Sequence, residues 1–155
     1  MARILDGIRI VDFTQGHMGS YGTMLLADFG AEVIKIEDPR TGGDVLRNSF
    51  PKNKKGSAYQ AYMNRGKKSV CIDRTSEAGQ QLIMELIKTA DVVCESFVAG
   101  EMETWGLGYE KAKAVNPGII YASDTGFGKT GPFSIRAGND ITAEALCGLM
   151  QITGF

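Results

Sequence analysis

Apolar and polar positions follow strand-like and helix-like patterns from the start of the chain. Residues 8–11 and 33–36 are rich in isoleucine and valine, as buried strands are. The segment between them fits a helix, with apolar positions at 24–26 and 29–31, and ends at Gly30, a residue common just past helix ends. A strand, a helix and a second strand predict a βαβ unit, whose strands are parallel and whose ligands bind beyond their carboxyl ends.

The same patterns recur along the rest of the chain. Three further strands are predicted, over residues 69–73, 90–95 and 119–123. Helices are predicted after the first, third and fourth strands, whereas a loop is predicted between the second and the third. A last helix is predicted over residues 141–152, where Asn139 or Asp140 is the expected N-cap. This order of elements predicts the α/β class, with a Rossmann-like parallel sheet and flanking helices.

The helix that follows the third strand carries the clearest local signals. Thr75 is expected to cap it, and Glu77 lies in its first turn, where the helix dipole favours an acid. Apolar residues at helical spacing predict its buried face: Leu82, Ile83, Leu86 and Ile87. A short helix to Trp105 and another over residues 109–115 are expected next, with Met102 and Trp105 in the core.

Polar and glycine-rich segments follow several of the predicted strands. The turn over residues 14–20 lacks the G-x-G-x-x-G spacing, so an ordinary dinucleotide site is not expected there. Residues 38–56 are predicted to form one long loop, in which the lysine-rich run 52–55 is a solvated face. Residues 125–132 form a glycine-rich loop. We expect these segments to meet at the ligand edge of the sheet.

Composition limits the classes of protein to which the chain can belong. A length of 155 residues suits one domain, and a net charge of −1 gives no global attraction to nucleic acid or to an anionic membrane. No apolar run is as long as a membrane span and the N-terminus lacks a signal-peptide pattern, so a cytoplasmic location is expected. Cys71, Cys94 and Cys147 lie in apolar runs and are expected to be buried thiols. With His17 the one histidine, no metal site is expected.

Seven segments in order resemble the family III CoA-transferases of the CaiB/BaiF type. This family includes the formyl-CoA, carnitine and bile-acid CoA-transferases and the α-methylacyl-CoA racemases. The matching segments cover nearly the whole chain: residues 5–14, 25–37, 64–70, 90–97, 106–108, 116–123 and 126–132. The resemblance implies that residues 1–155 are the N-terminal part of a large CoA-binding domain, with the small domain and the C-terminal part absent from this chain.

The resemblance also implies a reaction. Such enzymes transfer coenzyme A from an acyl-CoA to a free carboxylic acid through an aspartyl mixed anhydride and an enzyme thioester. The nucleophilic aspartate is expected after Phe155, so no catalytic nucleophile is expected within the chain. Coenzyme A and acyl-CoA are substrates, and no tightly bound cofactor is implied. The expected partner is a second copy in an interlocked homodimer, with neither nucleic acid nor membrane as a partner.

Candidate site residues come from the segments at the ligand edge. Gln15, His17 and Asp140 are candidates for supporting the catalysis. Arginine suits a phosphate because its guanidinium binds in a fork, and the backbone N–H groups of a glycine loop suit an oxyanion. The candidates for binding CoA are His17, Met18, Arg40, Ile72, Arg74, Thr75, Ser96, Phe97, Gly126, Phe127, Gly128 and Arg136. Basic residues elsewhere are further candidates for phosphate contacts: Arg47, Arg65, Lys67 and Lys68.

Two other functions stay open. The racemase branch has a histidine as its acid/base where this chain has Asn139. An amide does not act as a general acid or base near neutral pH, which disfavours racemisation. Helix capping is the structural role that Asn139 and Asp140 would otherwise have. The third hypothesis is a non-catalytic CoA-binding half or partner-binding module. The acyl group is not readable from these residues.

Overall fold

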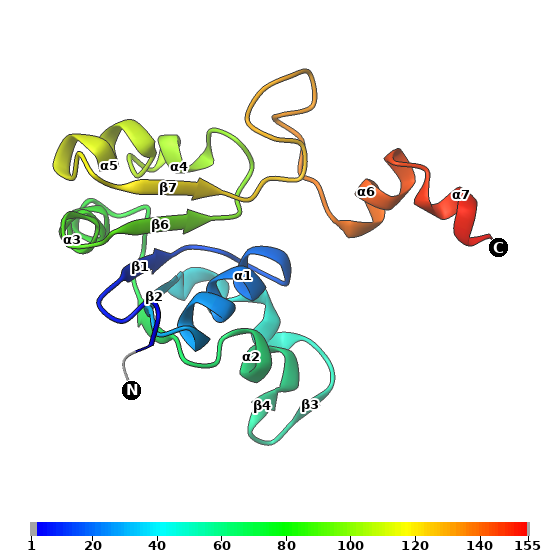
Figure 1. Cartoon of the computed structure of the whole chain (residues 1–155), viewed down its shortest axis with the longest axis horizontal. Coiled ribbons are helices and arrows are strands. Elements are labelled where there is room, and N and C mark those ends of the chain that lie inside the picture. The colour runs from blue at the N-terminus through cyan, green and yellow to red at the C-terminus, as the bar shows by residue number, and fades with distance from the viewer. Residues whose placement is uncertain (1–2, 155) are drawn as a thin grey trace.

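Five parallel strands form one sheet in the order β5-β2-β1-β6-β7 (Figure 1). The computed structural model describes residues 3–154; residues 1, 2 and 155 of the predicted domain lie outside the described part. The strands are β1 (Arg9–Asp12), β2 (Glu32–Glu37), β5 (Lys68–Cys71), β6 (Val92–Glu95) and β7 (Ile120–Ser123). All neighbours in this sheet pair in parallel. The predicted α/β fold and its five strands are confirmed.

Helices cover both faces of the sheet. Side chains along each strand point alternately to the two faces, so apolar side chains on each face need a covering layer. On one face, Val11 and Ile34 pack in a core cluster with Ile83 and Ile87 of α3 (Glu77–Lys88). The same cluster includes residues of α4 (Glu101–Thr104) and α5 (Tyr109–Val115). On the other face, Ile10 and Val33 pack with α1 (Met18–Asp28). Met102 is buried and Trp105 packs against the core, as predicted.

The start and the buried face of α3 differ in detail from the prediction. Ser76 rather than Thr75 caps the helix, because its Oγ accepts a hydrogen bond from Gly79 N at 3.1 Å. Thr75 Oγ1 instead donates to the Asp73 carboxylate. Leu82 is 59% exposed, whereas its neighbour Ile83 is fully buried. Successive residues of a helix point in directions that differ by about 100°, so Leu82 points away from the buried face on which Ile83 lies.

The predicted long loop after β2 contains regular structure. Two 3-10 turns, Pro39–Thr41 and Val45–Asn48, are followed by a hairpin of β3 (Lys52–Asn53) and β4 (Gly56–Ser57). The hairpin leads into α2 (Ala58–Met63) and projects from the body of the molecule (Figure 1). Its lysines are exposed, as the solvated-face interpretation predicts.

The predicted C-terminal helix is two short helices. α6 (Asp140–Leu146) and α7 (Leu149–Thr153) are separated at Gly148, whose φ of 80° lies in the left-handed region and ends the first helix. Figure 1 shows this pair of helices extending away from the sheet. Its large apolar side chains are exposed, Ile141, Leu146 and Ile152 among them.

The cysteine prediction holds for one residue of three. Cys94 is buried beneath α1, and burial raises the pKa of its thiol to about 12. Cys71 is exposed because β5 is an edge strand, and Cys147 is exposed because it lies between the projecting helices α6 and α7. Among residues 3–154, no helix is long and apolar enough to cross a membrane.

Two substitutions on α3 test this account of the core. We expect Ile83→Ala to lower the free energy of unfolding by ~2–5 kcal/mol, because it leaves a cavity between the sheet and α3. Leu82→Ala, on the exposed side of the same helix, is the control and should change it by less than ~1 kcal/mol. Urea unfolding followed by circular dichroism measures both. Equal losses in the two variants would contradict the assignment of the buried face.

Candidate functional site

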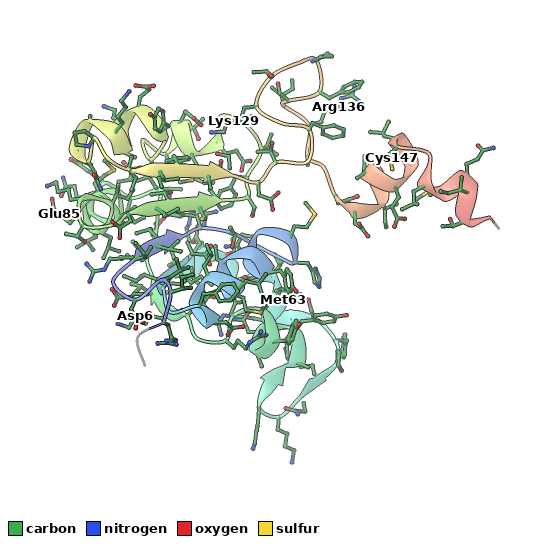
Figure 2. The ribbon with its side chains drawn as sticks, viewed as in Figure 1. Asp6, Met63, Glu85, Lys129, Arg136 and Cys147 are labelled. Atoms are coloured by element: carbon green, nitrogen blue, oxygen red, sulfur yellow. The ribbon has the colours of Figure 1, made fainter. Side chains whose placement is uncertain are left out.

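A cavity of about 340 Å³ lies at the carboxyl edge of the sheet. Four segments line it: the turn after β1 with the start of α1, residues 96–98 after β6, residues 124–126 after β7, and residues 136–140, which lead into α6. Figure 2 shows Arg136 on the loop between β7 and α6, where it joins this wall. Segments far apart in the sequence meet here because parallel strands all point their carboxyl ends to one edge.

Eight of the predicted site residues line this cavity. They are Gln15, His17, Met18, Ser96, Phe97, Gly126, Arg136 and Asp140. Ser96 holds the turn between β1 and α1, which we call the first turn, in place. Its Oγ accepts a hydrogen bond from Gln15 N at 2.8 Å. The His17 ring meets the Tyr59 ring of α2 edge to face, with centroids 5.0 Å apart. The single histidine therefore lies between the cavity and α2.

Four further predicted residues form a second group around the end of β5. Arg40 Nη2 contacts the Asp38 carboxylate at 2.6 Å and Arg74 Nη1 contacts the same carboxylate at 3.1 Å. The Arg40 guanidinium, helped by Arg74, holds the pKa of Asp38 below its usual range. Ile72 packs against the core and Thr75 bonds to Asp73, so neither presents a free polar group at this edge.

Arg74 connects the two groups. Its guanidinium carbon lies 4.3 Å from the centre of the Trp105 ring and 5.0 Å from that of Phe97, which lines the cavity. Its Nε is buried and has no hydrogen-bond partner within the described chain. Burial lowers the pKa of Arg74 against the opposing pull of Asp38, yet an arginine keeps its charge at any physiological pH.

Phe127 and Gly128 lie apart from the cavity. Phe127 packs against Phe133 with ring centres 5.8 Å apart, and Gly128 lines a different hollow beside Tyr121. Gly126, in contrast, is required at the cavity wall for steric reasons. A Cβ at Gly126 would lie 2.5 Å from the Cα of Gly138, so the two backbones cross only because both residues are glycines.

Asn139 and Asp140 have different positions at the start of α6. Asn139 is the N-cap, and its Oδ1 accepts a hydrogen bond from Thr142 N at 2.9 Å. Asp140 lies in the first turn, where the helix dipole favours a carboxylate. Asn139 thus caps the helix, whereas Asp140 lies at the cavity wall and does not cap it.

The remaining basic candidates all have acidic partners. Arg47 Nε donates to Glu37 Oε2 at 2.6 Å, Arg65 pairs with Asp28, and Lys68 pairs with Glu32. The side chain of Lys67 is 1% exposed, and its Nζ lies 3.0 Å from Asp12 Oδ2. Burial lowers the pKa of Lys67 in spite of this partner. The Lys67 ammonium group is thus engaged by partners within the chain, which include Asp12, Thr23 and Asn64.

Sequence reasoning missed a group of four buried charges beneath the first turn. We call Asp12, Lys35, Asp44 and Lys67 the buried quartet; each side chain is at most 1% exposed. Lys35 Nζ lies 2.7 Å from Asp44 Oδ2, beside the Lys67–Asp12 pair. One signal was readable: Lys35 stands alone among apolar residues in a strand predicted to be buried.

The described residues include no cluster of three or more histidine, cysteine, aspartate or glutamate side chains that could hold a metal. The cavity and its surroundings instead combine arginines, aromatic rings, amides and glycine backbone. Together with the parallel sheet, they define an α/β protein with an open cavity at the carboxyl ends of its strands, the edge where ligands bind in such sheets.

Comparison with known proteins gives the family. The model of CoA-transferase family III matches residues 5–155, and the chain belongs to this family. The resemblance noted in the sequence is thereby confirmed.

Similar proteins include succinyl-CoA:glutarate CoA-transferase from Mus musculus, with 44% identity over 97% of this chain and 34% of that protein. Acetyl-CoA:oxalate CoA-transferase from Acetobacter aceti is 39% identical over 97% of this chain and 38% of its own length. A crystal structure of a CaiB/BaiF family protein from Brucella suis superposes with a TM-score of 0.92 at 40% identity, over 99% of this chain and 42% of that one. The chain thus spans between a third and a half of the length of these relatives.

Glu37 gives a test of the electrostatics beside the site. Burial raises its pKa, but hydrogen bonds from Arg47, Ser69 and the Asp44 backbone outweigh this, and the pKa falls from 4.5 to about 2. A lowered folded-state pKa means that the stabilisation is present above the unfolded value near 4.5 and is lost as the pH falls toward 2.

We expect the stability difference between the native chain and Glu37→Gln to shrink by ~3 kcal/mol between pH 6 and pH 2. Urea unfolding at a series of pH values measures it. In Arg47→Met the loss of stability should begin at a higher pH, because the hydrogen bond that does most to lower the pKa of Glu37 is absent. A difference that stays constant with pH would show that Glu37 is not held in its charged form.

Proposed function

We propose that residues 1–155 form the N-terminal part of the large CoA-binding domain of an enzyme that transfers coenzyme A from an acyl-CoA to a free carboxylic acid. Membership of CoA-transferase family III supports the class of reaction. The observation that carries the assignment of the site is the cavity at the carboxyl edge, where four separate segments bring eight of the family-predicted residues together.

The proposed chemistry is nucleophilic catalysis by a carboxylate. An aspartate attacks the thioester carbonyl and expels CoA thiolate, which leaves an aspartyl mixed anhydride. The thiolate then attacks the aspartyl carbonyl of the anhydride, releases the first acid and forms an enzyme thioester. The incoming carboxylate repeats the two steps in reverse order. We place the nucleophile beyond Phe155. The contribution of this chain is to bind the CoA moiety and to supply backbone N–H groups near Gly126.

Arg74 is the proposed contact for a CoA phosphate, with Arg40 beside it. Both are arginines with planar forks, and both lie at the end of β5. Arg74 also has a buried Nε for which residues 3–154 offer no hydrogen-bond partner. Phe97 connects this group to the cavity, where the acyl end of the substrate would lie. The two groups of predicted residues would thus contact the two ends of one extended ligand.

A dicarboxylic acid is the proposed acceptor. Relatives with 39–44% identity are named for transfer to glutarate, oxalate and mesaconate. We further propose an interlocked homodimer in the cytoplasm. The exposed apolar side chains of α6 and α7 support burial of these helices in a larger assembly.

Racemisation of an α-methylacyl-CoA is the second candidate of the same family. Asn139 disfavours it, because its amide is engaged as the N-cap of α6 and has no pKa near neutral pH with which to act as a general acid or base. The third candidate function is that of a non-catalytic CoA-binding half that acts with another chain. This alternative and the transferase proposal share the same cavity and differ in turnover.

Binding of CoA to the chain tests the site. We expect Arg74→Met to weaken CoA binding roughly tenfold, because a charge-assisted contact is lost. Arg9→Met is the matched control: Arg9 pairs with Glu32 at the opposite end of the sheet, and the affinity should not change. Isothermal titration calorimetry measures both. Equal affinities for Arg74→Met and the native chain would refute the phosphate assignment.

Turnover decides among the three functions. The coding frame is sequenced past Phe155, and the protein encoded by the whole frame is incubated with succinyl-CoA and glutarate. Formation of glutaryl-CoA is expected for a transferase. Exchange of the α-proton of a 2-methylacyl-CoA in D₂O without transfer would favour the racemase. CoA binding with neither reaction would favour the non-catalytic module.

A further inference from the structure

The backbone of the first turn is held by side chains from other parts of the chain. Lys35 Nζ donates to Thr14 O at 2.6 Å, Gln15 N donates to Ser96 Oγ at 2.8 Å, and Gly16 N donates to Asp44 Oδ1 at 3.3 Å. Three successive residues thus each have an anchor outside the turn. Gln15 and His17 enter the cavity from this stretch of backbone, so its position sets theirs.

Two of the three anchors are one buried ion pair. Lys35 and Asp44 meet at 2.7 Å with side chains 1% and 0% exposed. Asp44 is itself fixed at both ends, because its backbone N donates to Glu37 Oε2 at 2.9 Å and its Oδ1 also accepts from Leu46 N. The pair is therefore rigidly mounted on β2 and on the segment that follows it.

Stability alone does not account for a charge pair in this place. Removing two charges from water costs several kcal/mol per ion, and apolar residues of similar volume often stabilise a fold as well or better. The particular property of this pair is geometric. It supplies a strong donor to Thr14 O and a charged acceptor to Gly16 N, where the chain turns with Gly16 at a φ of 73°.

The same segment also reaches the second group of site residues. It begins at Asp38, which contacts Arg40 and Arg74, and it continues to Asp44, which contacts Gly16. One short piece of chain therefore spans both ends of the proposed ligand site.

We propose that Lys35 and Asp44 are positioning residues, which set the backbone of Thr14–Gly16 and so place Gln15 and His17 in the cavity. Being buried, they act through the turn without touching the substrate. The consequence for CoA affinity rests on the proposed function, whereas the positioning of the turn does not.

Three variants separate positioning from simple stabilisation. Asp44→Asn and Lys35→Met each leave one buried charge unpaired, and each is expected to lower the melting temperature. The double variant Lys35→Met/Asp44→Asn removes both charges, so its stability should recover toward that of the native chain. Thr14 O still lacks its donor in the double variant. Asp28→Asn, at the exposed Arg65–Asp28 pair, is the matched control.

The readouts are the amide signals of residues 14–17 in ¹H–¹⁵N spectra and the affinity for CoA. In the double variant we expect these signals to stay displaced and the affinity to stay at least tenfold weaker, despite the recovered stability. Signals like those of the native chain, or an affinity that recovers together with stability, would overturn the proposal. Asp28→Asn should leave both unchanged. The spectra need no ligand, so a native chain that fails to bind CoA refutes the proposed function while the positioning is still decided.

Discussion

Four charges placed under the carboxyl edge of the sheet control the geometry of this protein. The buried quartet is neutral as a set, with two lysines and two aspartates, and each ion lies beside an opposite one. Removal of one partner leaves an uncompensated charge in a medium where water cannot screen it. The quartet therefore tolerates one arrangement of the segments that carry it, and the first turn, the segment after β2 and the entry to β5 are locked together.

The cavity depends on this arrangement. A parallel sheet brings strand ends to one edge, but it does not specify the conformation of the loops that leave them. Here Lys35 and Asp44 hold the first turn, Ser96 joins that turn to the end of β6, and Asp38 holds two arginines at the end of β5. Polar side chains of the site are thus placed by polar side chains below them, while the apolar core beneath keeps the strands in register.

The apolar surface of the chain is unevenly covered. α3, α4 and α5 close one face of the sheet over a continuous core, whereas Ile120 of the edge strand β7 and the large side chains of α6 and α7 remain exposed. The chain spans 34% of the length of succinyl-CoA:glutarate CoA-transferase from Mus musculus. An exposed apolar surface of this kind is typical of a region that contacts further protein.

The sequence by itself determined the five strands of the main sheet and most of the helices between them, because apolar periodicity, glycines and prolines act over a few residues. It also predicted eight residues that line the cavity, since their segments follow strands and parallel strands share an edge. It did not predict the β3–β4 hairpin and α2, which lie in a polar segment without such a pattern. Tertiary structure decided the rest. Whether Leu82 or Ile83 is buried depends on the rotation of α3 against the sheet, and the exposure of Cys71 depends on the edge position of β5. The partners of Lys35 and Lys67 come from residues 9 and 55 positions away, a distance over which no local pattern carries information, so only the folded chain pairs these charges.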